Sequence, residues 1–293
     1  MKKYKIGYIF SRLGIHFILI MWGILQVYPI FWMVFSSLKP QGKIFGEYMF
    51  SLPDSFYVEN YKNVLTPGDK GFGGGYRGIE DTVIVYLRNS AIVIVLSIIL
   101  ILVTSYIAAY AIAKMKFRGK NIILSLLIGM IGVPVHALMV PIYFFIADLG
   151  LLNNFFGLVL IYVGFGIPFS VLIMQSYFKD FPDELIEAAK IDGCGHFGAF
   201  FRIVIPISRN AISMVIVVNF INVWNEFLFS LIILKNIGVK TLSVGLMQFN
   251  NFFKAQWGDL FAVLTIAIIP TMLIYFIFQK HIVEGLQAGA IKE

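Results

Sequence analysis

Charged residues are scarce in this sequence. They make up 13% of its 293 residues, whereas a typical soluble globular domain contains about 25%. Cysteine is scarcer still: Cys194 is the only one, which excludes an intramolecular disulfide framework and any multi-cysteine metal cluster. The four histidines are dispersed without the spacing of metal ligands. Together with a hydrophobic fraction of 59%, the shortage of charge excludes an ordinary water-soluble fold.

The apolar residues are gathered into long runs that contain almost no charge. A helix needs about 20 apolar residues to cross the hydrocarbon core of a bilayer. Six stretches meet or approach that length: residues 13–35, 89–113, 121–147, 149–178, 210–234 and 260–279. Strands of a membrane barrel would instead alternate in polarity over about ten residues. We therefore predict an all-α integral membrane protein, a single domain over residues 1–293 with about six transmembrane helices.

Basic residues beside the apolar runs indicate the orientation of the chain, because cytoplasmic loops carry an excess of Lys and Arg. Two basic groups lie before the first run and between the second and third: Lys2, Lys3, Lys5 and Arg12, and Lys114, Lys116, Arg118 and Lys120. Both groups should be cytoplasmic, as should both termini, and residues 38–82 should form an external loop. Lys235, Lys240 and Lys254 do not fit this rule, because the predicted topology places them on the outside. Topology explains the net charge of +7 better than nucleic-acid binding does.

The most informative stretch connects the fourth and fifth runs, at about residues 179–207. Pro182 suits the first position of a helix and Gly193 suits its end, so a short amphipathic helix is predicted between them. A second short apolar segment, residues 196–205, follows and ends at Pro206. Two short helices joined at a glycine on the cytoplasmic face would form a compact docking surface. An ordinary surface loop is the alternative.

This stretch resembles the EAA loop of bacterial binding-protein-dependent importers. The resemblance lies in Glu187-Ala188-Ala189, in Asp192-Gly193 and in Ile203-Val204-Ile205-Pro206, although Ile205 and Asn210 stand where the family often has Leu and Pro. Residues 224–229, which read Trp-Asn-Glu-Phe-Leu-Phe, and the tail 279–292 are similar to the carbohydrate branch, which includes the maltose permease G subunit. The resemblance covers nearly the whole chain.

What the resemblance implies is the fold of a type I ABC importer permease in the bacterial plasma (inner) membrane. Such an importer contains a second permease subunit, two copies of an ATP-binding subunit and an extracytoplasmic sugar-binding protein. The residues that would couple this chain to the ATPase subunit are Glu187, Ala188, Ala189, Asp192, Gly193, Ile203 and Pro206. ATP and Mg would be bound by that partner, with no cofactor in this chain. The sequence has no Gly-x-x-x-x-Gly-Lys-Ser/Thr motif, so the chain is not itself an ATPase.

Glu226 is the only acid well inside a predicted span. Ionisable groups in a membrane are costly and usually face a cavity or a partner. Asn219, Asn222 and Glu226 follow i, i+3, i+7 spacing, which places them on one helix face. With Asn225 they are candidates for lining a translocation pathway. Hydrogen bonding to a neighbouring helix or loop, or an outer end that reaches water, are the alternatives.

The function that these features indicate is that of the transmembrane subunit of an ATP-driven sugar importer, with an oligosaccharide preferred on the resemblance alone. One alternative is a secondary transporter driven by an ion gradient, which predicts several intramembrane acids or paired broken helices. A second is a non-transporting membrane scaffold, which leaves the helix-Gly-helix loop unexplained.

Overall fold

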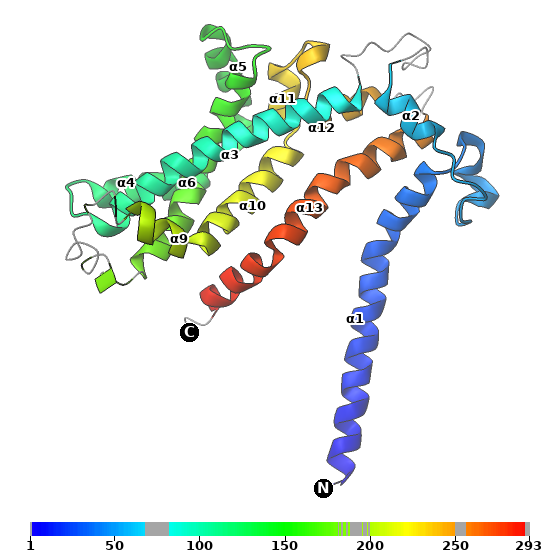
Figure 1. The fold of residues 1–293 in the computed structure, drawn as a ribbon, viewed down its shortest axis with the longest axis horizontal. Helices are drawn as coiled ribbons and strands as arrows, with labels where there is room; N and C mark the ends of the chain where they lie inside the picture. The colour runs from blue at the N-terminus through cyan, green and yellow to red at the C-terminus, as the bar shows by residue number, and fades with distance from the viewer. Residues whose placement is uncertain are drawn as a thin grey trace. The chain divides into compact units, whose positions relative to one another are not determined.

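A computed structural model describes residues 2–67, 82–180, 200–249 and 256–290, together with the single positions 182, 184, 185, 187, 195 and 198. Regular structure in these residues is helical throughout (Figure 1). The chain divides into two compact units: Met1–Val83 with Leu246–Ile268, and Ile84–Gly245 with Ile269–Glu293. They are called the first and second unit below.

Four helices contain a stretch long and apolar enough to cross a membrane: α1 (Lys2–Ser37), α3 (Val83–Lys114), α6 (Phe155–Lys179) and α13 (Trp257–Ala290). Two helix pairs pass the same test together but are bent. The first joins α4 (Lys120–Ile131) to η5 (Val135–Leu138) and α5 (Met139–Asp148) at 92°. The second joins η6 (Phe200–Val204) and α9 (Ile205–Ile207) to α10 (Arg209–Asn225) at 66°. The described residues thus hold four spans, or up to six if each bent pair is one span, which agrees with the predicted number.

Three of the predicted spans differ from the observed helices. The run 121–147 breaks before η5, where Pro134 has extended backbone and disfavours helical backbone at Val133. The run 149–178 becomes helical only at Phe155, because the Asn154 side chain accepts a hydrogen bond from the Phe156 N–H at 2.9 Å and thereby caps α6. The run 210–234 is interrupted after Asn225, and the short helix α11 (Leu228–Ile233) follows.

The first unit joins the carboxyl end of α1 to the start of α13 through an irregular segment. That segment contains η1 (Gln41–Lys43), η2 (Gly46–Tyr48) and α2 (Glu59–Leu65), and η8 (Leu246–Phe249) belongs to the same unit. The Trp32 ring packs edge-on against Phe261 with centroids 5.1 Å apart. The Asn60 amide donates to the carbonyls of Ser37 and Lys39 at 2.8 and 2.9 Å. These contacts fix the turn that follows α1.

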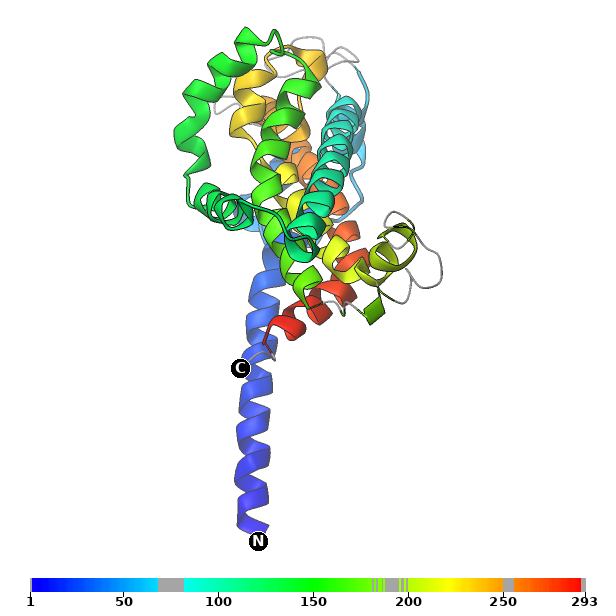
Figure 2. The same cartoon turned by 90° about the vertical axis from the view of Figure 1, so that its left-hand side faces the viewer.

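In the second unit α6 contacts α4, α10 and α11 (Figures 1 and 2). Two apolar clusters lie at opposite ends of these helices. The outer cluster joins the starts of α3 and α6 to the end of α10 and to α11; its core includes Val93, Leu158, Tyr162, Phe220 and Phe229. The inner cluster joins the ends of α3 and α6 to η6 and the start of α10; its core includes Tyr106, Ile112, Phe178, Val204 and Val215. The names follow the predicted topology, with the inner end in the cytoplasm.

Candidate functional site

Glu226 lies one residue beyond α10, and its carboxylate caps the short helix α11. Oε1 accepts a hydrogen bond from the Phe229 N–H at 2.8 Å, and Oε2 accepts one from the Ser230 N–H at 3.2 Å. The first N–H groups of a helix have no acceptor within the helix. A negative charge at this end also interacts favourably with the helix dipole. The carboxylate therefore offsets the free-energy cost of interrupting the helix at this point.

Tyr162 of α6 binds the same carboxylate from the side. Its hydroxyl donates to Glu226 Oε2 at 2.6 Å and lies 2.9 Å from Ser230 Oγ. Ser243 Oγ donates to the Glu226 carbonyl at 2.8 Å. The Tyr162 side chain is buried in the outer cluster, so its hydroxyl has little access to water. The break between α10 and α11 is thus attached to α6 and to α12 (Leu242–Gly245).

The other predicted pathway residues lie in different surroundings. Asn219 is 4% exposed; its amide donates to Ser170 Oγ of α6 at 2.9 Å and to the Val215 carbonyl at 2.8 Å. Asn222 and Asn225 are exposed, and the Asn225 amide donates back to the Ile221 carbonyl at 2.9 Å. Since α10 ends at Asn225, the i, i+7 relation of Asn219 to Glu226 does not continue along one helix.

Further polar side chains fix the backbone that follows α11. The Asn89 amide at the start of α3 donates to the carbonyls of Gly238 and Lys240 at 3.0 and 2.9 Å. Ser90 Oγ accepts from the Leu242 N–H at 2.8 Å. The segment includes η7 (Ile237–Val239). Side chains of α3 therefore provide hydrogen-bond partners for backbone groups of this irregular segment.

Asn153 attaches the same segment to the turn before α6. Its Oδ1 accepts from the N–H groups of Lys235 and Asn236 at 2.7 and 3.0 Å, and its own N–H donates to the Ile233 carbonyl at 2.9 Å. The residue has φ 55°, a left-handed conformation that asparagine tolerates better than most residues. Sequence reasoning missed Asn153, although an Asn in the short turn between two apolar runs is a recognisable signal.

Three of the seven predicted coupling residues lie within the described part of the chain. Glu187 has helical backbone and is exposed, Ile203 lies half-buried in η6, and Pro206 is exposed in α9. The remaining four predicted residues, Ala188, Ala189, Asp192 and Gly193, lie outside the described residues.

Aromatic rings support the segment that leads out of this loop. Tyr106 of α3 packs edge-on against Phe178 of α6 and Phe200 of η6, with centroids 5.0 and 5.1 Å apart. The Tyr106 hydroxyl lies 2.5 Å from Ser208 Oγ, and the Tyr177 hydroxyl donates to the Ile207 carbonyl at 2.8 Å. A displacement of η6 and α9 would therefore press directly on α3 and α6. Sequence reasoning did not single out these aromatic residues.

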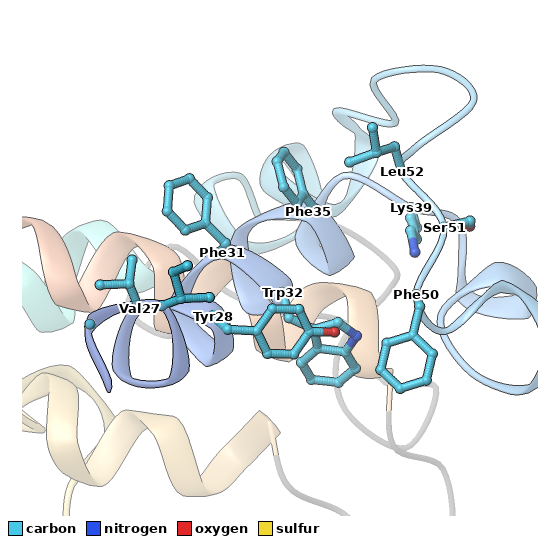
Figure 3. Close-up of a pocket in the computed structure, with 11 residues that line it drawn as sticks. Val27, Tyr28, Phe31, Trp32, Phe35, Lys39, Phe50, Ser51 and Leu52 are labelled. Carbon is cyan, nitrogen blue, oxygen red and sulfur yellow. The ribbon is translucent and has the colours of Figure 1, made fainter. Parts of the chain in front are cut away.

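The first unit holds an apolar hollow of about 480 Å³ beside the carboxyl half of α1 (Figure 3). Side chains that line it are Val27, Tyr28, Phe31, Trp32 and Phe35 of α1, with Phe50, Leu52 and Lys39 from the following segment. Lys39 is 2% exposed and its Nζ donates to the Tyr48 carbonyl at 2.9 Å. Burial lowers the pKa of this ammonium group. Within the described part of the chain, no group of three His, Cys, Asp or Glu residues could hold a metal ion.

Comparison with known proteins gives a consistent match. The family model of the binding-protein-dependent transport system inner membrane component matches residues 101–287. The chain is 35% identical to the probable ABC transporter permease protein YurM of Bacillus subtilis, over 90% of this chain and 83% of that protein. It is 32% identical to the multiple sugar-binding transport system permease protein MsmG of Streptococcus mutans, over 99% of both.

Two further matches are a permease protein of an uptake system and a solved structure. The diacetylchitobiose uptake system permease protein NgcG of Streptomyces coelicolor is 32% identical, over 94% of this chain and 88% of that protein. The fold matches a chain in the crystal structure of a bacterial ABC transporter involved in alginate import, with a TM-score of 0.78 and 22% identity over 93% of this chain and 96% of that one. The chain therefore belongs to the family of inner membrane components of binding-protein-dependent transport systems, as a multi-pass ABC permease whose ATP-binding site lies in a partner subunit.

Proposed function

We propose that this chain forms half of the translocation pathway of an ATP-driven importer of oligosaccharides. The observation that carries the substrate class is the set of relatives named for saccharides. Besides the diacetylchitobiose and multiple-sugar permeases, they include the arabinooligosaccharides transport system permease protein AraQ of Bacillus subtilis, 28% identical over 96% of both chains. These relatives span nearly the whole chain, so the resemblance is not confined to one motif.

The proposed complex contains a second permease subunit, two ATP-binding subunits and an extracytoplasmic sugar-binding protein. Family membership supports such an assembly, because the family description refers to a separate binding protein. Gentle purification from the native membrane, followed by identification of every co-purified protein, tests it. Recovery of an ATPase subunit, a second permease and a binding protein is expected. Ligand binding by the recovered binding protein then identifies the sugar, whereas a chain that purifies alone would contradict the proposal.

Coupling to the ATPase subunit is proposed to run through the loop at residues 179–207. Exposure of Glu187 and Pro206 supports this. So do the aromatic contacts that connect η6 to α3 and the Tyr177 hydrogen bond that connects α6 to α9. Closure of the ATPase subunits would move the loop, and these contacts would transmit the movement to the helices. Such a movement shifts the equilibrium between inward- and outward-facing states only if the partner binds the two states differently.

The substitution Gly193→Pro tests the coupling role, because proline constrains the backbone at the proposed joint between the two short helices. We expect loss of sugar uptake while the protein still inserts into the membrane at normal levels. Gly195→Ala is the control: Gly195 is exposed, and a Cβ there meets no described atom within 4 Å, so most uptake should remain. Normal uptake by the Gly193 variant would reject this loop as the coupling element without affecting the family assignment.

The pathway lining is proposed to include Asn222 and Asn225 on the exposed face of α10. Their amides can exchange hydrogen bonds with sugar hydroxyls. Asn219 and Glu226 are bonded to α6 and α11; they would position this face and contact a sugar only when those bonds open.

A further inference from the structure

The turn between α3 and α4 (Figure 1) gathers basic residues in a part of the sequence that contains no acids. Lys114, Lys116, Arg118 and Lys120 fall within seven residues, and the sequence has no Asp or Glu between Asp81 and Asp148. Lys116 and Arg118 are exposed. In the part of the chain that the structure describes, Lys116, Arg118 and Lys120 form no ion pair. Their charges are therefore available to an external anion.

The turn is also hollowed and partly apolar. A surface hollow of about 390 Å³ is lined by Met115, Lys116, Phe117, Gly119, Lys120, Asn121 and Ile122. Exposed fractions of the apolar side chains are 57% for Met115, 40% for Phe117 and 67% for Ile122. Apolar and basic side chains thus alternate along the turn. This alternation is typical of segments at a membrane surface, where apolar groups enter the bilayer and cations meet the headgroups.

The hollow continues onto a helix face suited to lipid. Ile122 belongs to α4, and further exposed side chains of this helix are Ile123, Leu126, Ile128, Met130 and Ile131. The helix contains no charged residue after Lys120. An acyl chain lying along this face would begin where the cations gather.

The turn lies at the cytoplasmic end of the second unit. The inner cluster packs Ile112, two residues before the end of α3, with Phe178 and Val204 on either side of the coupling loop. The four basic residues follow the excess of Lys and Arg in cytoplasmic loops. The cytoplasmic leaflet carries anionic lipids, which attract such cations with a contribution of about 1 kcal/mol each.

We propose that the turn between α3 and α4 binds the headgroup of an anionic phospholipid of the cytoplasmic leaflet, with an acyl chain lying along α4. Lys116, which lines the hollow, and Arg118, an exposed residue of the same turn, contact the phosphate. Met115, Phe117 and Ile122 contact the upper part of the acyl chain. A soluble phosphate compound would use the cations but leave these apolar side chains in water. The site is independent of the transported sugar.

The test titrates the purified importer complex with short-chain phosphatidylglycerol and, separately, with zwitterionic phosphatidylcholine, and counts bound lipids by native mass spectrometry. The double variant Lys116→Gln/Arg118→Gln should weaken phosphatidylglycerol binding roughly 30-fold, since each cation contributes about a fivefold factor. Binding of phosphatidylcholine should not change.

The matched control is Arg209→Gln/Lys280→Gln, which removes the same charge from exposed positions of the same unit that lie outside both the hollow and the proposed coupling loop. It should leave phosphatidylglycerol binding within about twofold of the original chain. Equal weakening by both double variants would overturn the site, because the effect would then be general surface charge. Displacement of the lipid by inorganic phosphate alone, or loss of the ATPase subunit from the Lys116/Arg118 variant with lipid binding intact, would also overturn it.

Discussion

The two ends of the second unit support irregular backbone in different ways. At the outer end, side chains bond directly to backbone groups, as Glu226 does to α11 and Asn89 to residues 238 and 240. At the inner end, rings pack around η6, and two tyrosine hydroxyls complete the contacts. Hydrogen bonds weaken steeply when misaligned, whereas aromatic pairs tolerate centroid separations of about 4.5–7 Å. The contacts at the outer end therefore tolerate less displacement than those at the inner end.

The largest effect is expected from Glu226→Ala at the outer end. The substitution removes the acceptor for two N–H groups of α11 and for the Tyr162 hydroxyl. Loss of a helix cap and of charge-assisted hydrogen bonds should lower the free energy of unfolding by about 2–4 kcal/mol. Thermal unfolding in detergent and sugar uptake in membranes measure the two consequences. We expect impaired uptake while the ATPase subunit remains bound.

Asn225→Ala is the control for the unfolding measurement alone, because Asn225 is itself proposed to line the pathway. Asn225 is the preceding residue and exposed, and its amide bonds only within its own helix turn among the described contacts. Its removal should change the unfolding temperature little. If Glu226→Ala unfolded at the original temperature and transported normally, the carboxylate would have neither the capping nor the positioning role.

A matched pair of tyrosine substitutions compares how much a single hydroxyl contributes to stability at each end. Tyr162→Phe leaves the Glu226 carboxylate without one donor, and it should destabilise by about 1.5–3 kcal/mol. Tyr106→Phe keeps the ring packed against Phe178 and Phe200, and Ser208 Oγ still donates to the Val204 carbonyl at 2.7 Å. It should cost only about 0.5–1.5 kcal/mol. The unfolding temperatures of the two variants test this contrast. Equal temperatures, or a lower temperature for Tyr106→Phe, would contradict it.

The smallest effect is expected in the loop between α1 and α3, where Lys43 Nζ lies 2.5 Å from Asp54 Oδ2. The hydrogen bond from Lys43 holds the pKa of the Asp54 carboxyl below its usual range. A lowered folded-state pKa stabilises the fold above the unfolded-state pKa, and this contribution is lost as the pH falls through the folded-state value. Because the pair is exposed, the contribution is small.

The variant Lys43→Gln should therefore unfold slightly below the original chain at neutral pH, and the difference should vanish in acid. Unfolding temperatures of both chains across this pH range provide the measurement. A difference that grew towards acid pH would have the wrong sign for this ion pair.

Sequence patterns predicted the membrane class and the approximate spans because long uncharged runs have few alternatives in a lipid environment. They also indicated that Glu226 is unusual, since an acid within an apolar run needs a partner. They did not predict the break after Asn225, because Leu228–Ile233 is as apolar as the helix before it. Nor did they identify Tyr162, whose partner lies 64 positions further along the chain. Contacts of that separation leave no local pattern.

The polar contacts of the outer end also set an order of events during synthesis. Asn89 and Ser90 are made about 150 residues before their partners at Gly238, Lys240 and Leu242, and Asn153 precedes Lys235 by 82 positions. Until the ribosome has released the later segment and it has been translocated, these early side chains have only water or the translocation machinery as partners. A nascent chain truncated before residue 234 would therefore lack the backbone groups that pair with Asn89, Ser90 and the Asn153 side chain.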